Sequence, residues 1–312
     1  MKLKLLILTM FSALSMCAFD LMPYKRIVCF GDSITHGGYY HMFLQEYLAE
    51  TDPDHPRMVI NRGISGNTVP KLLERVDTML KEDRPDLVII MIGTNDLLIS
   101  KKIAEKELPF ESAVKKYAVF NWFEKNLGQL LDIFNQAKVP VVLLATPPYN
   151  ESSNPEMKSP SIANLNSSGV KNLQIVEQRL ATQKGAVWID IYTPLMKNLL
   201  ENDASFPRGK KDRVHPSWAE HLIIANTILG KQYKPGRKAA AAQKYKNAQH
   251  MIQTIQWHLS RLPKDCTTPE ARIEFFKKRV PKAMLENLKD PEAKLKELYQ
   301  VRDEAFRKLY VK

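Results

Sequence analysis

The chain has 312 residues, of which 44% are hydrophobic and 26% are charged. This composition is that of an ordinary globular protein and excludes collagen-like, intrinsically disordered and membrane-embedded classes. The formal net charge is +12, but residues 231–312 hold 20 Lys and Arg against 9 Asp and Glu, whereas the first 230 residues hold 26 against 25. The basic character therefore belongs to the C-terminal part of the chain.

The basic C-terminal part has two interpretations. Basic segments bind nucleic acid, anionic polymers or anionic membrane surfaces. Acidic residues are interleaved with the basic ones here, which favours the solvated faces of helices. No nucleic-acid partner is expected, and contact of this part with an anionic surface or a protein partner stays open.

The three cysteines, Cys17, Cys29 and Cys266, predict neither a disulfide framework nor a metal site. The chain contains no Cys-x-x-Cys and no His-x-x-x-His pair, which are the common spacings of zinc ligands. Cys29 lies in an apolar segment and is interpreted as a small core residue. No metal is predicted.

The N-terminus has the pattern of an export signal. A cationic start is followed by an apolar stretch at residues 5–16, which is too short to span a bilayer but typical of a signal peptide. Leu-Ser-Met-Cys, ending at Cys17, resembles a bacterial lipobox, although Met16 replaces the small residue usual there. We predict a signal peptide over residues 1–18, ended either by lipidation of Cys17 or by conventional cleavage near Cys17 or Ala18. The mature protein is then periplasmic, secreted or anchored to a membrane as a lipoprotein.

Apolar segments alternate with helical patterns through residues 22–232. The run at residues 86–92 is almost continuously apolar, as in strands that are buried on both faces of a parallel sheet. Five strands are predicted, at residues 27–30, 58–60, 86–92, 139–145 and 186–191. The spacing of apolar residues predicts helices at residues 39–50, 69–81, 111–138, 162–183, 193–202 and 217–230.

This alternation predicts an α/β fold, a three-layer α/β/α sandwich around a five-stranded parallel, flavodoxin-like sheet of order 2-1-3-4-5. In that order the ends of the first and third strands flank the point where such sheets bind ligands. Residues 233–312 contain no strand candidate, and four prolines divide them into helices, including residues 239–262 and 291–310. We predict a domain at residues 22–232 and a basic α-helical extension at residues 233–312.

Polar blocks follow the predicted strands and contain the residue types that ester hydrolysis needs. Such chemistry requires a nucleophile, a base that takes its proton and a group that orients the base. Ser33 supplies a hydroxyl directly after the first strand, and His215 supplies a base that titrates near neutrality. Asp212 lies three residues before His215, close enough for a compact loop to place its carboxylate against the ring.

Donors for a developing oxyanion are also present. The backbone N–H groups of Ser33 and Gly63 and the side-chain amide of Asn95 are candidates for a three-donor site, since glycine allows the backbone to approach a substrate closely.

Several neighbouring residues are assigned supporting roles. Asp32 and Asp96 are expected to brace their loops rather than react, and His36, His41 and His221 to pack or form hydrogen bonds. The candidates for the lining of a substrate pocket are Asp32, His36, Tyr39 and Tyr40.

Taken together, Gly-Asp-Ser-Ile-Thr at residues 31–35, Gly-Ile-Ser-Gly-Asn-Thr at residues 63–68, Gly-Thr-Asn-Asp at residues 93–96 and Asp-Arg-Val-His-Pro at residues 212–216 resemble the GDSL/SGNH hydrolase superfamily. The four name-giving residues of that family correspond here to Ser33, Gly63, Asn95 and His215, with Asp212 as the acid of the triad. The resemblance covers about residues 25–230 and leaves out the C-terminal extension. It implies serine-hydrolase chemistry on esters or thioesters, without a metal or other cofactor.

Other enzyme classes lack their motifs in this chain. The serine esterase signature Gly-x-Ser-x-Gly is absent, and so are the glycine-rich loops of nucleotide-binding proteins. The expected activity is a Ser-His-Asp esterase acting on small acyl esters, acetyl esters above all, including those on carbohydrates. Two alternatives stay open: a lysophospholipase or thioesterase, and a non-catalytic binding or scaffold protein that uses its basic helical tail.

Overall fold

The computed structural model describes residues 19–98, 118–151, 164–202, 212–236, 238–259, 262–263, 266, 268–277, 280 and 282–311. The predicted signal peptide at residues 1–18, with Cys17, lies outside these ranges. No helix within them is both long and apolar enough to cross a membrane.

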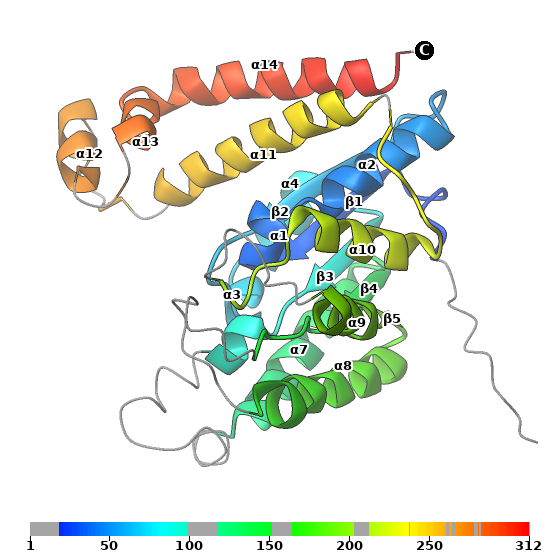
Figure 1. Cartoon of the computed structure of the whole chain (residues 1–312). Helices are drawn as coiled ribbons and strands as arrows, with labels where there is room; N and C mark the ends of the chain where they lie inside the picture. The colour runs from blue at the N-terminus through cyan, green and yellow to red at the C-terminus, as the bar shows by residue number, and fades with distance from the viewer. Residues whose placement is uncertain are drawn as a thin grey trace, which may run out of the picture.

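A five-stranded parallel sheet forms the centre of the molecule (Figure 1). The strands are β1 (Arg26–Gly31), β2 (Met58–Gly63), β3 (Leu87–Met91), β4 (Val141–Leu144) and β5 (Val187–Ile189). Their order is β2-β1-β3-β4-β5, so the predicted flavodoxin-like order is confirmed. Gly31 pairs with Gly63 on one side and with Met91 on the other. The segments that follow these three strands therefore leave the sheet at the same end, where the carboxyl ends of the strands lie.

Helices cover both faces of the sheet, which confirms the predicted three layers (Figure 1). On one face α2 (Tyr40–Thr51) packs against α10 (Trp218–Leu229), and α9 (Tyr192–Asn202) lies beside α10. On the other face α7 (Val119–Gln136) packs against α8 (Lys171–Lys184). Every side chain of β3 and β4 is buried between these layers, as their continuous apolar runs predict.

Two predicted helices differ in detail from the observed ones. The helix expected over residues 162–183 begins, within the described residues, as a π-helical segment η1 (Leu165–Val170) that continues into α8. The helix expected over residues 69–81 is two helices, α3 (Val69–Leu73) and α4 (Val76–Asp83).

Arg75 marks the break between α3 and α4. Its guanidinium turns inward and donates hydrogen bonds to Arg62 O at 2.8 Å and Gly31 O at 3.0 Å. The backbone of Arg75 has non-helical dihedral angles, φ −130° and ψ 2°, so the helical run is interrupted at this residue. Arg75 thus ties α4 to the ends of β1 and β2.

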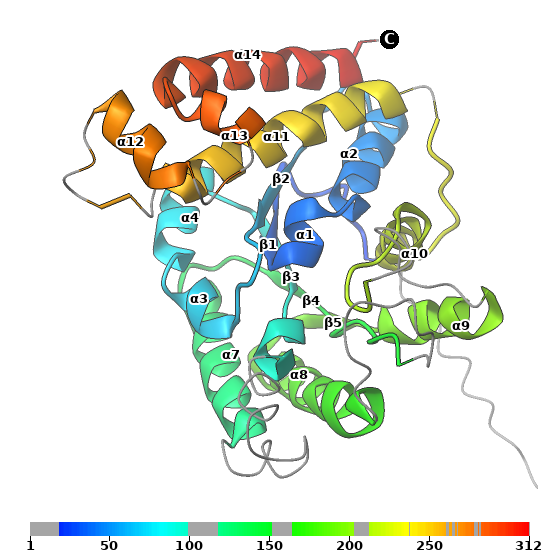
Figure 2. The same ribbon diagram turned by 60° about the vertical axis from the view of Figure 1, so that its left-hand side comes forward.

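The C-terminal extension is helical, as predicted. Its helices are α11 (Ala239–Leu259), α12 (Pro269–Phe276), α13 (Lys282–Asn287) and α14 (Pro291–Leu309). Figures 1 and 2 show α11 and α14 side by side along one flank of the sandwich. Tyr245 and Leu309 join the main hydrophobic core, while Ile255 and Phe276 belong to a second cluster within the extension.

Two glutamine side chains seal the outer edge of β2. Gln45, from α2, donates to Arg57 O at 2.9 Å and accepts from Val59 N–H at 2.8 Å. Gln249, from α11, donates to Val59 O at 3.2 Å and accepts from Asn61 N–H at 3.0 Å. The two amides therefore supply the hydrogen bonds that a sixth strand would make at this edge.

Candidate active site

Ser33 is the first residue of a short helix, α1 (Ser33–Gly37), that starts directly after β1. Asp32 caps this helix, since its Oδ1 accepts a hydrogen bond from Ile34 N–H at 2.9 Å. The sequence predicted no helix before residue 39, because five residues are too few to show a periodic apolar pattern. The cap holds the Ser33 hydroxyl at the rim of the sheet.

His215 connects Ser33 to Asp212. His215 Nε2 lies 2.7 Å from Ser33 Oγ, and His215 Nδ1 lies 2.5 Å from Asp212 Oδ2. An ionised carboxylate only accepts hydrogen bonds, so Nδ1 carries the proton and donates to Asp212. Nε2 is then the acceptor for the Ser33 hydroxyl. Three residues predicted from separate motifs therefore form one hydrogen-bonded chain.

A compact turn places Asp212 against the imidazole. Asp212 Oδ1 accepts from Val214 N–H at 2.8 Å and from His215 N–H at 3.3 Å, which leaves Oδ2 for the ring. Burial raises the pKa of Asp212, but the hydrogen bonds from the His215 ring and the backbone outweigh it and hold that pKa below its ordinary value. Asp212 is therefore ionised at neutral pH.

Gly63 does not fit the oxyanion role predicted for it. It is the last residue of β2, and its N–H donates to Asn61 Oδ1 at 2.9 Å. A Cβ at this position would lie 2.2 Å from His36 N, because α1 packs directly on the strand here. The prediction for Gly63 is wrong: the N–H is engaged inside the fold, and the missing side chain makes room for α1.

Gly66, in the same sequence block, has the properties that Gly63 lacks. It lies in a turn closed by a hydrogen bond from Asn67 N–H to Ile64 O at 3.1 Å, and its φ of +80° is one that glycine adopts readily. No residue within the described ranges accepts a hydrogen bond from its N–H, and the space around its Cα is open. Ser65 Oγ lies 3.0 Å from His36 Nδ1 and so fastens this turn to α1.

The amide of Asn95 lies between the turn and the nucleophile's helix. Its Nδ2 donates to Asn67 O at 3.0 Å and makes a longer contact of 3.4 Å with Asp32 Oδ2. The longer contact is near the limit for a hydrogen bond, so one amide hydrogen is only weakly held.

Asp32 and Asp96 brace the site in the way the sequence suggested. Both side chains are buried, and Asp96 Oδ1 accepts from Val69 N–H, at the start of α3, at 3.1 Å. Burial raises the pKa of Asp32 to about 6 and the pKa of Asp96 to about 8. Their backbone hydrogen bonds hold α1 and α3 at the two strand ends.

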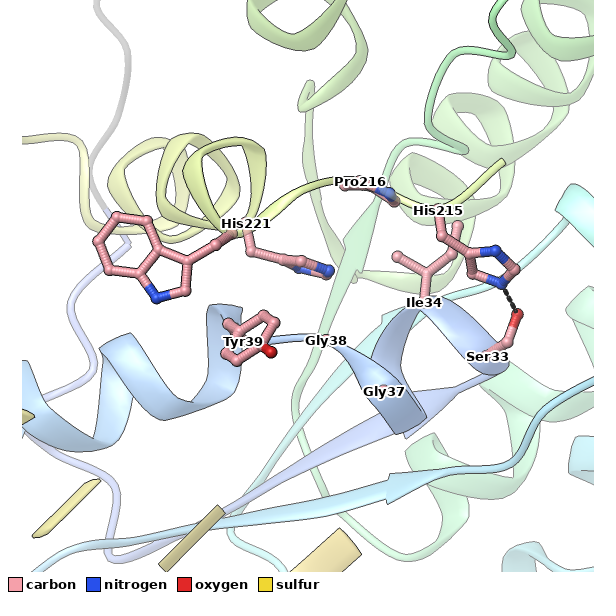
Figure 3. A pocket seen from close by; sticks show the side chains of 9 residues that line it. Ser33, Ile34, Gly37, Gly38, Tyr39, His215, Pro216 and His221 are labelled. Atoms are coloured by element: carbon pink, nitrogen blue, oxygen red, sulfur yellow. Dashed lines mark hydrogen bonds between the residues drawn. The ribbon is translucent and has the colours of Figure 1, made fainter. Parts of the chain in front are cut away.

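A cavity of about 140 Å³ opens beside Ser33 and His215 (Figure 3). It is lined by Ser33, Ile34, Gly37, Gly38, Tyr39, His215, Pro216, Trp218 and His221. Figure 3 shows the hydroxyl of Ser33 and the ring of His215 at one end, with Tyr39 and His221 at the other.

Of the predicted pocket residues, Tyr39 alone lines this cavity. Asp32 is covered by α1. Tyr40 is fully buried, with its hydroxyl 3.1 Å from Thr35 Oγ1. The ring of His36 is directed away, toward the Gly66 turn and α11. Successive residues of a helical segment face different directions, so nearness to Ser33 in sequence does not place a side chain in its cavity.

Trp218 and His221 line the cavity but were not predicted to do so. They follow His215 by three and six residues, at the start of α10. Trp218 and His221 are three residues apart on one helix and so share a face, and their closeness to His215 in the sequence is the signal that could have identified them. His221 also packs as predicted, stacked on Tyr40 with ring centroids 6.0 Å apart.

The C-terminal helix α11 reaches the surroundings of the site. Lys246 Nζ lies 4.2 Å from the ring centroid of Tyr39. The ring of His250 lies 4.4 Å from that of His36, and Thr254 Oγ1 is 3.3 Å from His36 Nε2. The extension therefore contacts two side chains that closely follow the nucleophile.

A nucleophile, a base, an acid that orients the base and nearby N–H donors are the parts that acyl transfer needs. Among the residues that the structure describes, no group of three or more His, Cys, Asp or Glu side chains is arranged to hold a metal ion.

Residues 29–222 match the GDSL-like Lipase/Acylhydrolase family. The chain belongs to this family. The resemblance found in the sequence is thereby confirmed, and the matched residues contain the end of β1, the whole of β2 to β5, and Ser33, Asp212 and His215.

The chain is 27% identical over 223 residues to a curated acetylxylan esterase from Geobacillus stearothermophilus, an alignment that covers 66% of this chain and 92% of that protein. The solved structure of the acetylxylan esterase Axe2 from the same organism has a TM-score of 0.50 at 22% identity, over 68% of this chain and 96% of Axe2.

Another solved structure resembles a larger part of this GDSL-like protein. BT4096, a gut microbial diltiazem-metabolizing enzyme, has a TM-score of 0.70 at 15% identity, over 92% of this chain and 94% of its own. Coverage of 92% extends the likeness of fold into the C-terminal helices.

Proposed function

We propose that this protein is a serine esterase that hydrolyses short acyl esters, with acetyl esters of carbohydrates as its substrates. The observation that carries the proposal is the hydrogen-bonded chain from Asp212 through His215 to Ser33, which ends at a small cavity. Membership of an acylhydrolase family supports ester chemistry. Similarity to an acetylxylan esterase supports the acetyl group and the carbohydrate.

The first step forms an acyl-enzyme. His215 Nε2 takes the proton of the Ser33 hydroxyl as Oγ attacks the acyl carbonyl carbon, and the ionised Asp212 stabilises the imidazolium. When the tetrahedral intermediate collapses, the same proton passes from Nε2 to the leaving alcohol. In the second step His215 deprotonates a water, which attacks the acyl-enzyme, and the proton then returns to Ser33 as the carboxylic acid leaves.

The oxyanion of the intermediate is assigned to three donors. They are the N–H of Ser33 at the start of α1, the N–H of Gly66 in its turn, and the weakly held amide hydrogen of Asn95. Such preorganised donors are worth about 10²–10³-fold each in kcat. Gly66 replaces Gly63 in this assignment because the N–H of Gly63 is already bound to Asn61.

The size of the cavity supports a short acyl group. Its volume of about 140 Å³ is close to that of engineered protein cavities of ~150 Å³ that bind benzene. An acyl group of about six heavy atoms fills that space, whereas a fatty acyl chain would extend beyond the residues that line it. For this reason we favour an esterase over a lysophospholipase or thioesterase that acts on long chains.

Export of the enzyme is part of the proposal and rests on the N-terminal sequence. The apolar residues 5–16 and Cys17 support a signal peptide that is either cleaved or lipidated. Cell fractionation with mass spectrometry of the mature N-terminus tests this, and an intact Met1 on protein recovered from the cytoplasm would refute it.

The catalytic proposal is tested with Ser33→Ala. Hydrolysis of p-nitrophenyl acetate and acetate release from acetylated xylan should both fall to the residual ~10³–10⁴-fold over water that remains when such triads are broken. If the variant keeps most of the native turnover, Ser33 is not the nucleophile.

Two comparisons separate the alternatives. Acetyl esters should be cleaved faster than octanoyl esters, and the reverse order would favour a long-chain acylhydrolase. A fluorophosphonate probe should label Ser33 in the native protein but not in the variant. Absence of both labelling and turnover would favour a binding or scaffold protein.

A further inference from the structure

Two adjoining cavities lie where the sandwich meets the C-terminal extension, away from Ser33. Each has a volume of about 400 Å³. The first lies between β2 and α4 on one side and α11 and α14 on the other, and the second continues between α4 and α11. Both are lined by Arg62, Glu82, Gln253 and Gln256, so we treat them as one feature, the junction groove.

Gln253 is the unusual residue of the junction groove. Its side chain is 9% exposed, and neither Oε1 nor Nε2 has a hydrogen-bond partner among the residues described. Gln249, one turn earlier on α11, uses both ends of its amide on β2. A buried amide without partners is unfavourable, and a polar ligand entering either cavity would offset that cost.

The charges around the groove do not favour an anion. Arg62 is ion-paired with Asp83 at 2.6 Å and with Glu82 at 3.0 Å. Arg302 is ion-paired with Asp303 at 2.6 Å. The other two arginines of the lining are turned toward the protein, since Arg26 donates to Asp83 O and Arg75 donates to Arg62 O and Gly31 O. The guanidinium groups are therefore engaged within the protein, and the amide of Gln253, which has no partner within the described ranges, is left for a neutral polar ligand.

A peptide added as a further strand does not fit either. The outward-facing groups of Val59 and Asn61, which a peptide strand would need, are bonded to Gln45 and Gln249. The ligand must therefore be recognised by side chains alone.

The hydroxyls of a sugar form hydrogen bonds with planar polar side chains, and its ring faces pack against aromatic rings. Gln253 and Gln256 line both cavities, Tyr299 lines the first and Trp257 the second. Gln256 Nε2 donates to the Tyr299 hydroxyl at 3.1 Å, so the amide of Gln253 is the one without a partner in the described part of the chain. Each volume lies within the ~300–1,000 Å³ of pockets that bury a drug-sized ligand. The geometry points to a binding site for a neutral oligosaccharide in the junction groove.

The position of the groove relates it to the active site. The second cavity reaches Ile64, the first residue of the turn that contains Gly66. A glycan bound in the second cavity would extend toward the Gly66 turn beside the active site. The groove would then hold the carbohydrate whose ester is cleaved. This role rests on the proposed function, whereas binding by itself does not.

The test uses the full-length Ser33→Ala variant and calorimetric titration with unacylated xylohexaose, mannohexaose and cellohexaose. At least one should bind with a Kd in the millimolar range or below. Adding Gln253→Leu should weaken that binding at least tenfold without lowering the melting temperature, because no hydrogen bond is lost. Gln300→Leu, on the exposed face of α14, is the matched control and should bind like its parent.

If Gln253→Leu does not fold, Trp257→Ala replaces it and should cause a similar loss. The proposal is overturned if none of the three oligosaccharides binds, or if the groove variant binds as tightly as the control. Hydrolysis of p-nitrophenyl acetate without glycan binding would overturn the groove and leave the esterase standing. If the native protein cleaves no ester but binds a glycan, and the groove variant loses that binding, the groove proposal stands and the esterase proposal falls.

Discussion

Lys246, near the middle of α11, holds its ammonium 4.2 Å from the ring centroid of Tyr39, which lines the cavity beside Ser33. The two residues are about two hundred positions apart in the sequence and come from different parts of the fold. An extension that the family match does not cover therefore supports a wall of the candidate active site.

Replacing Lys246 by Met should weaken substrate binding more than turnover. A cation over an aromatic ring contributes about 0.5–2 kcal/mol, so we expect kcat/KM for p-nitrophenyl acetate to fall ~2–30-fold, mainly through KM. Tyr39 borders the cavity and does not touch the reacting atoms, which is why kcat should change little. Lys244→Met, an exposed position on the same helix, is the control, and equal kinetics of the two variants would show that the contact is irrelevant.

Asp212→Asn should leave the fold intact and lower kcat by about 10⁴-fold. The variant keeps the size of the side chain but removes the charge that holds the proton on His215 Nδ1. Steady-state kinetics measure the loss, and a circular dichroism spectrum like that of the native protein excludes unfolding. A loss of less than tenfold would mean that Asp212 does not orient the base.

Gly63→Ala and Gly66→Ala should separate the two glycines of one sequence block. A Cβ at Gly63 would meet backbone atoms of α1 that cannot move aside, so severe loss of stability is expected. At Gly66 the Cβ enters open space, and the positive φ alone costs about 1–2 kcal/mol. Thermal unfolding distinguishes them, and a normal melting temperature for Gly63→Ala would contradict the packing described for α1.

Glu177 should make stability fall as the pH rises. It is fully buried on α8, where Oε1 accepts from Thr146 Oγ1 at 2.5 Å, and burial raises its pKa to about 7 from an ordinary value of 4.5. Between these values the folded protein binds more protons than the unfolded chain, so the free energy of unfolding decreases with increasing pH.

Glu177→Gln does not titrate and should lack this contribution. From pH 4 to pH 8 the native protein should lose on the order of 3 kcal/mol of stability relative to the variant. Urea unfolding across this range measures the difference, with Glu74→Gln at an exposed position as the control. A difference that does not change with pH would show that Glu177 is ionised in the folded state throughout.

The strands and the chain of Ser33, His215 and Asp212 could be predicted because local patterns mark them, whereas the strand order came from the usual arrangement of such five-stranded folds. Continuous apolar runs identify buried parallel strands, and the ends of neighbouring strands bring their polar blocks together. Where a residue's surroundings are determined by distant segments, the predictions were wrong. His36 turns toward Thr254 of α11, and Gly63 is needed by α1 rather than by a substrate.

The break at Arg75 has the same origin. Apolar spacing indicates one helix, but the carbonyls that attract the guanidinium belong to β1 and β2. The residues of α10 that line the cavity could have been predicted, since Trp218 and His221 lie three apart on a helix that begins just after His215.

The edge strand β2 is completed by hydrogen bonds to Gln249, a side chain far along the chain, and this affects the protein during its synthesis. Gln249 is made 188 residues after Asn61, whose N–H it binds. At ribosomal rates of about 5–20 residues per second, that part of the edge stays open for roughly 10–40 s while the rest of the chain is completed. During this interval the nascent sheet can pair with a neighbouring copy. The last helices to be made therefore end the period in which the protein is most prone to aggregate.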